Sequence, residues 1–404
     1  MLSLPLATLA LASPAASPAR WHVDRRAAIL RKHPELLDLA SPEPLTLPLL
    51  VATNSAQLAA CITCAHLPAA ELLPTAVLLG GTLSLWQFAL LHDVKHGTAA
   101  LPSKLSANDV LFAGSLPSLF GYYLYLRHGH LSHHKNFGTL PLKALFDSEV
   151  SNFEDGDALF VAHRQSMPGD APDKQIGFLG KKDVGGLGIS ISRTIYSLFW
   201  ADPGDTSVSQ RLAPLWNACV YSFSMTFERA ALVVGGGYAV ALTGRNYFFP
   251  NKPQSFHDNA SMYARASLLL QLVLLAAVGP GAIVYLFWAE VGWQLPIHPA
   301  SAMFVSNHPS LDAKGATGVH GCQPTASVYL GEWYDWLCCF SNFHVEHHDF
   351  PDVPAFRLRK LRDRAATFYS SEALHGCEDG WWETMRRTFV RRDFYACSGV
   401  GEEA

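Results

Sequence analysis

Eight histidines fall in three short clusters, and this pattern constrains the fold more than any other feature of the chain. The clusters read HDVKH (His92, His96), HLSHH (His130, His133, His134) and HVEHH (His344, His347, His348). Residues i, i+3 and i+4 of a helix share one face, so each cluster can direct two or three imidazoles at a common point. One structural zinc is usually closed by four ligands, which eight imidazoles exceed. Imidazole also suits iron, and two groups of about four ligands predict a pair of iron ions that bind oxygen.

A single HxxxH pair is weak evidence, because two histidines at this spacing arise readily by chance. Two HxxHH clusters and one HxxxH, all beside apolar segments, are not explained in this way. We therefore interpret the eight histidines as one set of metal ligands, and we predict no catalytic residues beyond the ligands themselves.

The composition indicates a membrane protein. Of the 404 residues, 49% are hydrophobic and only 16% are charged, whereas an average soluble chain has about 25% charged residues. The formal net charge of −4 provides no basic surface, so no nucleic-acid partner is expected.

Four apolar stretches are long enough to cross a bilayer, which takes about 20 helical residues. They lie at 45–67, 74–91, 221–243 and 266–289. A shorter apolar run, 110–126, is expected to lie in the interface or to re-enter the membrane. The sequence therefore predicts an all-α membrane protein with about four transmembrane helices and a cytosolic, histidine-rich di-iron cap.

Basic residues predict the orientation in the membrane. They gather before the first span, from Arg20 to Lys32, and after the last histidine cluster, from Arg357 onwards. The positive-inside rule places both termini in the cytosol. Two hairpins then put all three clusters on the cytosolic side. The N-x-S sequon at Asn259 is expected in the lumenal loop between the third and fourth spans.

The remaining segments complete the expected domain organisation. Residues 1–19 are apolar and small, and we expect a disordered leader there. Residues 45–365 are expected to form the membrane domain, with a cytosolic insertion at about 148–210 that is rich in Gly, Asp and Ser. Residues 366–404 are expected to form a cytosolic tail.

Acidic residues inside and beside the clusters are candidates to fix the tautomers of the imidazoles, since a ligating histidine usually donates its other N–H to an acceptor. Asp93 lies inside the first cluster and Glu346 inside the third. Asp349 directly follows the third cluster. The alternative for each is a solvated acid at the membrane interface.

Several stretches resemble the membrane fatty-acid desaturase and hydroxylase superfamily, and within it the sphingolipid 4-desaturases. The three clusters are similar to its histidine boxes. The N-terminal WHVDRRAAILRKHPELLDLASPEP resembles that family's signature, which we assign to residues 20–44. NFHVEHHDFPDVPAFRLRKLR resembles its third box with the basic helix that follows, and IHPASAMFVSNH resembles a histidine-bearing segment before that box.

The last of these segments implies a ninth metal ligand. His308 matches the final histidine of the family pattern, whereas Met303 stands in place of a histidine and Asn307 in place of a glutamate. We expect His308 to bind iron, His298 not to bind it, and Asn307 to support a bound water or ligand. The alternative is that His308 lies on a turn and binds nothing.

The resemblance also implies an activity. A sphingolipid 4-desaturase introduces a trans double bond at C4 of the sphingoid base of dihydroceramide, giving ceramide. Such an enzyme holds two Fe²⁺ ions, uses O2 as co-substrate and receives electrons from NADH through cytochrome b5 and its reductase. The implied location is the endoplasmic reticulum membrane.

Two other functions remain open. The first is a lipid hydroxylase or a carotenoid ketolase, because HDVKHGT at 92–98 resembles the first box of β-carotene ketolases; the N-terminal signature and HHDFP argue for the sphingolipid branch. The second is a non-catalytic membrane protein that binds metal or lipid. That reading predicts lost ligands, whereas all eight box positions are histidine.

Overall fold

The computed structural model of the chain describes residues 18–119, 121–131, 134, 198–201, 206–246, 253–307, 323, 325–374, 376–377 and 379–389. Its regular elements are helices, apart from one isolated bridge between Glu43 and Ala99. The predicted all-α fold is therefore confirmed for this part of the chain. Almost all of the expected leader, most of the expected insertion, and residues 390–404 of the expected tail lie outside the described residues.

Among the described residues, three helices are long and apolar enough to cross a membrane. They are α2 (Thr46–Cys64), the continuous helix formed by α3 (Ala69–Thr75), η2 (Ala76–Gly80) and α4 (Gly81–His96), and α13 (Gln254–Ala277). The first two agree with the predicted spans at 45–67 and 74–91. The second contains a π-helical turn just after Pro74, and a proline without an N–H disturbs the regular hydrogen-bond ladder at such a point.

The predicted span at 266–289 is divided between two helices. α13 ends at Ala277, and α14 (Pro280–Gly292) starts after Gly279, whose φ of 106° suits glycine alone. α14 packs against η2 through small residues. A side chain on Gly292 would meet the backbone of Val77, and one on Gly80 would meet Ala289. Such contacts let membrane helices approach closely.

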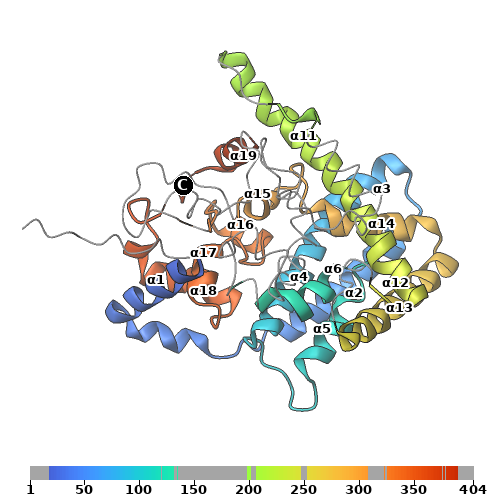
Figure 1. Ribbon diagram of the computed structural model, residues 1–404, viewed down its shortest axis with the longest axis horizontal. Coiled ribbons are helices and arrows are strands. Elements are labelled where there is room, and N and C mark those ends of the chain that lie inside the picture. Colours follow the sequence, from blue (N-terminus) through green and yellow to red (C-terminus); the bar gives the residue numbers. More distant parts are fainter. Residues whose placement is uncertain are drawn as a thin grey trace, which may run out of the picture.

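The predicted span at 221–243 does not stand as a separate membrane helix. It lies in a longer helical segment made of α11 (Ser207–Leu232), η4 (Val233–Tyr238) and α12 (Ala239–Thr243), and this segment is not among the three membrane-spanning candidates of the described residues. Buried Arg229 within it donates a hydrogen bond to the side chain of Gln294, while Phe223 and Val234 remain exposed. Figure 1 shows this helix running along the edge of the bundle.

Contacts at the helix ends identify which ends share a side of the membrane. The bridge between Glu43 and Ala99 joins the start of α2 to the end of α4. At the opposite end, Gly281 of α14 packs against the backbone of Ala65, which follows α2. The first two spans and the pair α13–α14 therefore form two hairpins whose turns lie away from the histidines.

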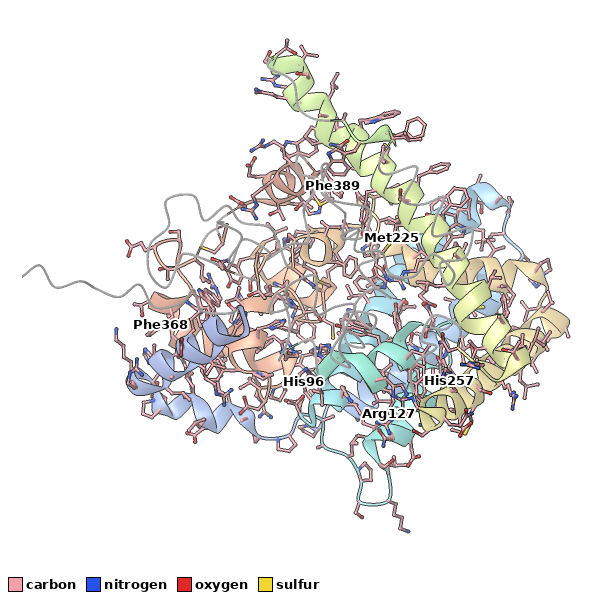
Figure 2. The ribbon with its side chains drawn as sticks, in the orientation of Figure 1. His96, Arg127, Met225, His257, Phe368 and Phe389 are labelled. Atoms are coloured by element: carbon pink, nitrogen blue, oxygen red, sulfur yellow. The ribbon has the colours of Figure 1, made fainter. Side chains whose placement is uncertain are left out.

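Asn259 lies near the histidine end of α13. The ring of Phe256, three residues earlier, lies 4.8 Å from that of His128, which precedes the second cluster, and Figure 2 draws the labelled Arg127 and His257 close together. The expectation that Asn259 faces the lumen, across the membrane from the histidines, is therefore wrong. Hydropathy placed a span before Asn259 where the chain instead forms the α11–α12 segment.

The cap consists of the N-terminal and C-terminal helices. It contains α1 (Pro18–Lys32), η1 (Pro34–Ala40), α15 (Ser301–Val305), α16 (Glu332–Leu337), α17 (His344–Asp349), α18 (Ala355–Arg364), η6 (Ala366–Phe368) and α19 (Trp381–Phe389). Buried residues of α1, η1 and α18 share one apolar core with the residues around α17. In Figure 1 these helices gather beside the end of α4, so the metal-binding clusters lie where the cap meets the bundle.

The side of the membrane on which residue 259 lies can be tested by cysteine labelling in sealed membranes. In a background in which Cys64, Cys219, Cys322 and Cys397 are changed to serine, Asn259→Cys is expected to react from the same side as Lys360→Cys, at an exposed position of α18. His66→Cys, in the exposed turn after α2, is expected to react from the other side. Labelling of residue 259 together with residue 66 would contradict the two-hairpin arrangement.

Candidate metal centre

Each histidine cluster sits where a helix ends or a short helix begins. His92 and His96 occupy the last two turns of α4, which stops because Gly97 adopts a left-handed φ of 74°. His130 follows a π-helical turn, η3 (Tyr125–Gly129), which comes after α6 (Gly121–Leu124) and α5 (Ala107–Ser115). The third cluster is the six-residue α17 itself.

The three clusters converge. One potential ligand atom from each of five histidines lies within 4.8 Å of all the others. These histidines are His92, His96, His130, His134 and His347. Figure 2 labels His96 at the junction of the cap and the bundle. The residues come from segments that are far apart in sequence, so their convergence is a property of the fold.

The distances within this group fit a metal ion. The Nε2 atom of His130 lies 2.8 Å from Nε2 of His96 and 3.2 Å from Nε2 of His134, and Nε2 of His347 lies 3.0 Å from that of His134. With metal–nitrogen bonds of about 2.1 Å, neighbouring ligands at right angles lie about 3.0 Å apart and opposite ligands about 4.2 Å apart. A neutral imidazole carries one N–H and one lone pair, so a metal ion bound among these nitrogens would accept the lone pairs directed at it.

His344 and His348 lie beside this group. The ring of His348 is 4.2 Å from that of His134 and 4.6 Å from that of His344, measured between ring centroids. The two remaining predicted ligands, His133 and His308, lie outside the described residues. The assignment of all nine histidines as iron ligands stays a prediction.

The environment favours the neutral imidazole that a metal requires. Burial lowers the pKa of His347 well below its usual value, and the neighbouring histidines His92, His96, His134 and His344 lower it further. The hydroxyl of Tyr125 lies 3.1 Å from Nδ1 of His130. This contact leaves Nε2 of His130 directed at the other imidazoles.

The acidic residues of the clusters have well-defined partners. Asp93 accepts hydrogen bonds from the backbone N–H of Ala355, at the start of α18. Glu346 accepts hydrogen bonds of 2.7 Å from Ser327 and 2.5 Å from Tyr329, and burial raises its pKa to about 7. Both carboxylates thus tie the metal-binding clusters to neighbouring cap segments. Their predicted action on ligand tautomers stays a prediction.

Asp349 and Asn307 connect further cap segments. Asp349 accepts hydrogen bonds from His22, Arg25 and Tyr369. The backbone oxygen of Asn307 accepts a hydrogen bond from the N–H of Ala326, and its buried side-chain oxygen has no hydrogen-bond partner among the described residues. The segment before the third cluster is thereby held close to the residues that contact Glu346. Support of a bound water or ligand by Asn307 stays a prediction.

His298 lies in a contact of its own. Its Nδ1 accepts the backbone N–H of Ala300 at 3.1 Å, and its Nε2 lies 3.3 Å from the carbonyl oxygen of Leu78 and 3.2 Å from the hydroxyl of Thr82. Both ring nitrogens therefore have protein partners, in line with the expectation that His298 does not bind iron. Met303 is buried in α15, and its backbone N–H donates to the hydroxyl of Tyr334.

Sequence reasoning missed two residues near the centre. Tyr125 lies in the short apolar run before the second cluster, where no pattern distinguishes its hydroxyl. His22 belongs to the N-terminal signature, and its ring lies 5.0 Å from that of His348. A histidine within the N-terminal signature was the one hint of a role for His22. Its distance in sequence from the third cluster gave no indication that the two would lie together.

Residues 196–375 match the fatty acid desaturase family. The sphingolipid delta(4)-desaturase/C4-monooxygenase DES2 of Homo sapiens is 25% identical over 362 residues, which cover 88% of this chain and 84% of the relative. A sphingolipid delta(4)-desaturase of Schizosaccharomyces pombe is 23% identical over 367 residues, covering 87% and 77%. The chain is therefore similar to fatty acid desaturases over residues 196–375 and to sphingolipid delta(4)-desaturases over most of its length.

Other relatives match this chain over a shorter segment, less than half of their own length. The acyl-lipid (8-3)-desaturase of Rebecca salina is 34% identical over 159 residues, which cover 38% of this chain and 37% of the relative. A Caenorhabditis elegans relative is 28% identical over 156 residues, which cover 37% of this chain, and the match spans 40% of that relative. No solved structure matches the chain.

Loss of one converging imidazole should release metal. His134→Ala and His347→Ala are each expected to lower iron affinity by more than about tenfold, since loss of an outer partner of a ligand alone costs about 10–100-fold. Iron per purified chain, measured by atomic absorption, checks this. His66→Ala, in an exposed turn, is the matched control. Full iron in both ligand variants would contradict the site.

His298 should make stability depend on pH. Burial lowers its pKa from 6.5 to about 4, so the folded protein keeps it neutral while the unfolded chain protonates below about pH 6.5. Its contribution to stability is therefore lost as pH falls from about 6.5 to about 4, by up to about 3 kcal/mol. Thermal unfolding in detergent is expected to be less pH-sensitive in His298→Gln, whose amide nitrogen can replace Nε2. Identical pH profiles would contradict this assignment.

Proposed function

We propose that this protein is an oxygen-dependent membrane desaturase that introduces a trans double bond at C4 of the sphingoid base of dihydroceramide, giving ceramide. The observation that carries the proposal is the convergence of five histidines from all three clusters on one point. Relatives named sphingolipid delta(4)-desaturase, similar over most of the chain, support the choice of substrate.

Different histidines would hold the two metal ions. The five converging histidines would bind through neutral imidazoles. His344 and His348, together with His133 and His308, would complete the set around a second ion. When bound, two iron ions would supply activation of O2 and removal of hydrogen from unactivated methylene groups. The balanced reaction takes O2, two electrons and two protons for each double bond and releases two water molecules.

The protein's own contribution is placement and protection. The ring of Phe88 lies 6.3 Å from that of His92 and packs against Tyr122 and Trp293. Together these rings place apolar surface beside His92, which would limit the access of water. The hydroxyl of Tyr125 holds His130 in place. Electrons from NADH through cytochrome b5 and its reductase, and a location in the endoplasmic reticulum with cytosolic termini, complete the proposal.

Hydroxylation at C4 is the second candidate. The human relative carries both desaturase and C4-monooxygenase in its name. Both outcomes begin at the same carbon and differ in whether a second hydrogen or an oxygen atom is transferred. The position of the substrate chain decides between them.

The test is expression in a host that lacks sphingolipid 4-desaturation, followed by mass spectrometry of its sphingolipids. We expect ceramide, formed when dihydroceramide loses two hydrogens at C4 and C5. Ceramides that have gained one oxygen would instead support the hydroxylase. His130→Ala and His347→Ala are expected to abolish product, and His66→Ala to retain it. Unchanged dihydroceramide with an iron-loaded protein and a working electron donor would contradict the proposal.

A further inference from the structure

The N-terminal helix α1 packs directly against α17, the short helix that carries the third histidine cluster. His22 and Arg25 project from α1 into this contact and are buried, with 6% and 3% of their surface exposed. In Figure 1 the two helices lie together in the cap. More than 300 residues of sequence separate them.

The carboxylate of Asp349, the last residue of α17, is held on both oxygens. Nδ1 of His22 lies 2.7 Å from one oxygen, while Nε of Arg25 and the hydroxyl of Tyr369 each lie 3.1 Å from the other. A buried carboxylate is costly without such partners, and charge-assisted hydrogen bonds are the strongest available. Asp349 therefore fixes the end of α17 to α1.

The other side of the His22 ring is also engaged. Its Nε2 lies 3.1 Å from the hydroxyl of Thr325. Its face lies 5.0 Å from the ring of His348, with a tilt of 32°. The ring of His348 in turn lies 4.2 Å from that of His134, one of the five converging residues. Two successive ring contacts, from His22 to His348 and from His348 to His134, therefore connect the N-terminal signature to the converging histidines.

We propose that His22 is a positioning residue of the metal centre, which orients His348 and fixes α17 through Asp349. α17 has only six residues, too few to be stable alone, so the directions of its imidazoles depend on its contacts. Glu346 secures one side through Ser327 and Tyr329, and His22 secures the other. This inference rests on the proposed metal-binding function, and it assigns a role to the N-terminal signature.

Variants of full-length protein in detergent test this role. His22→Ala removes the hydrogen bond and the ring. His22→Asn keeps a donor at the place of Nδ1 but removes the ring. His33→Ala, directly after the same helix, is the matched control. The side-chain hydrogen bond of His33 goes to exposed Glu35. Iron affinity is measured with a competing chelator, and the bound iron is examined by Mössbauer spectroscopy.

His22→Ala is expected to lower iron affinity by about 10–100-fold and to alter the Mössbauer spectrum. His22→Asn should recover part of the affinity, and His33→Ala should match the unchanged chain. Equal affinity and spectra in His22→Ala and the unchanged chain would overturn the proposal. If His22→Ala does not fold, His22→Asn decides, and its having the affinity and spectrum of the unchanged chain would overturn it.

The two proposals fail in different ways. An unchanged chain that binds no iron would overturn the metal centre itself, whatever the His22 variants do. An unchanged chain that binds iron but converts no dihydroceramide would overturn the substrate assignment and leave the role of His22 standing. Iron binding is measured without substrate, so the two results are independent.

Discussion

Imidazole nitrogens that face one another at about 3 Å are the contacts on which the arrangement of the molecule depends. Unprotonated nitrogens at this distance repel through their lone pairs, whereas a cation between them converts repulsion into ligation. The bundle, the cap and the N-terminal helix can all be understood as the support for this convergence.

The support is built at two levels. In the membrane, close packing between α14 and η2 through glycine fixes the bundle from which α4 emerges with His92 and His96. In the cap, buried carboxylates bind each short element to its neighbour: Asp93 holds the start of α18, and Asp349 holds α1. The converging histidines lie where the bundle meets the cap. A substitution that loosens the packing of either part should therefore change the positions of the imidazoles.

The location of the cluster also bears on the proposed chemistry. On one side of the histidines the rings of Phe88, Tyr122 and Trp293 pack together next to His92, and the proposed lipid substrate would approach there. The opposite side is closed by the cap, including α1 and the residues that contact Glu346. A reaction that removes hydrogen from methylene groups benefits from both, since water is excluded and the substrate approaches in one direction.

The sequence by itself determined the ligand type, the three clusters, the first membrane hairpin and the likeness to desaturases, because local spacing and hydropathy carry these features. Tertiary packing decided features that local spacing and hydropathy do not encode. Residues 221–243 are apolar, but they lie in a longer helical segment that is not among the membrane-spanning candidates of the described residues, and Arg229 within it is buried against Gln294. Gly279 and Pro280 divide the stretch at 266–289, and the ring contact between Phe256 and His128 places Asn259 near the histidine end of α13, not on the expected opposite side. His22 reaches Asp349 across 327 positions, and only tertiary packing brings such distant residues together.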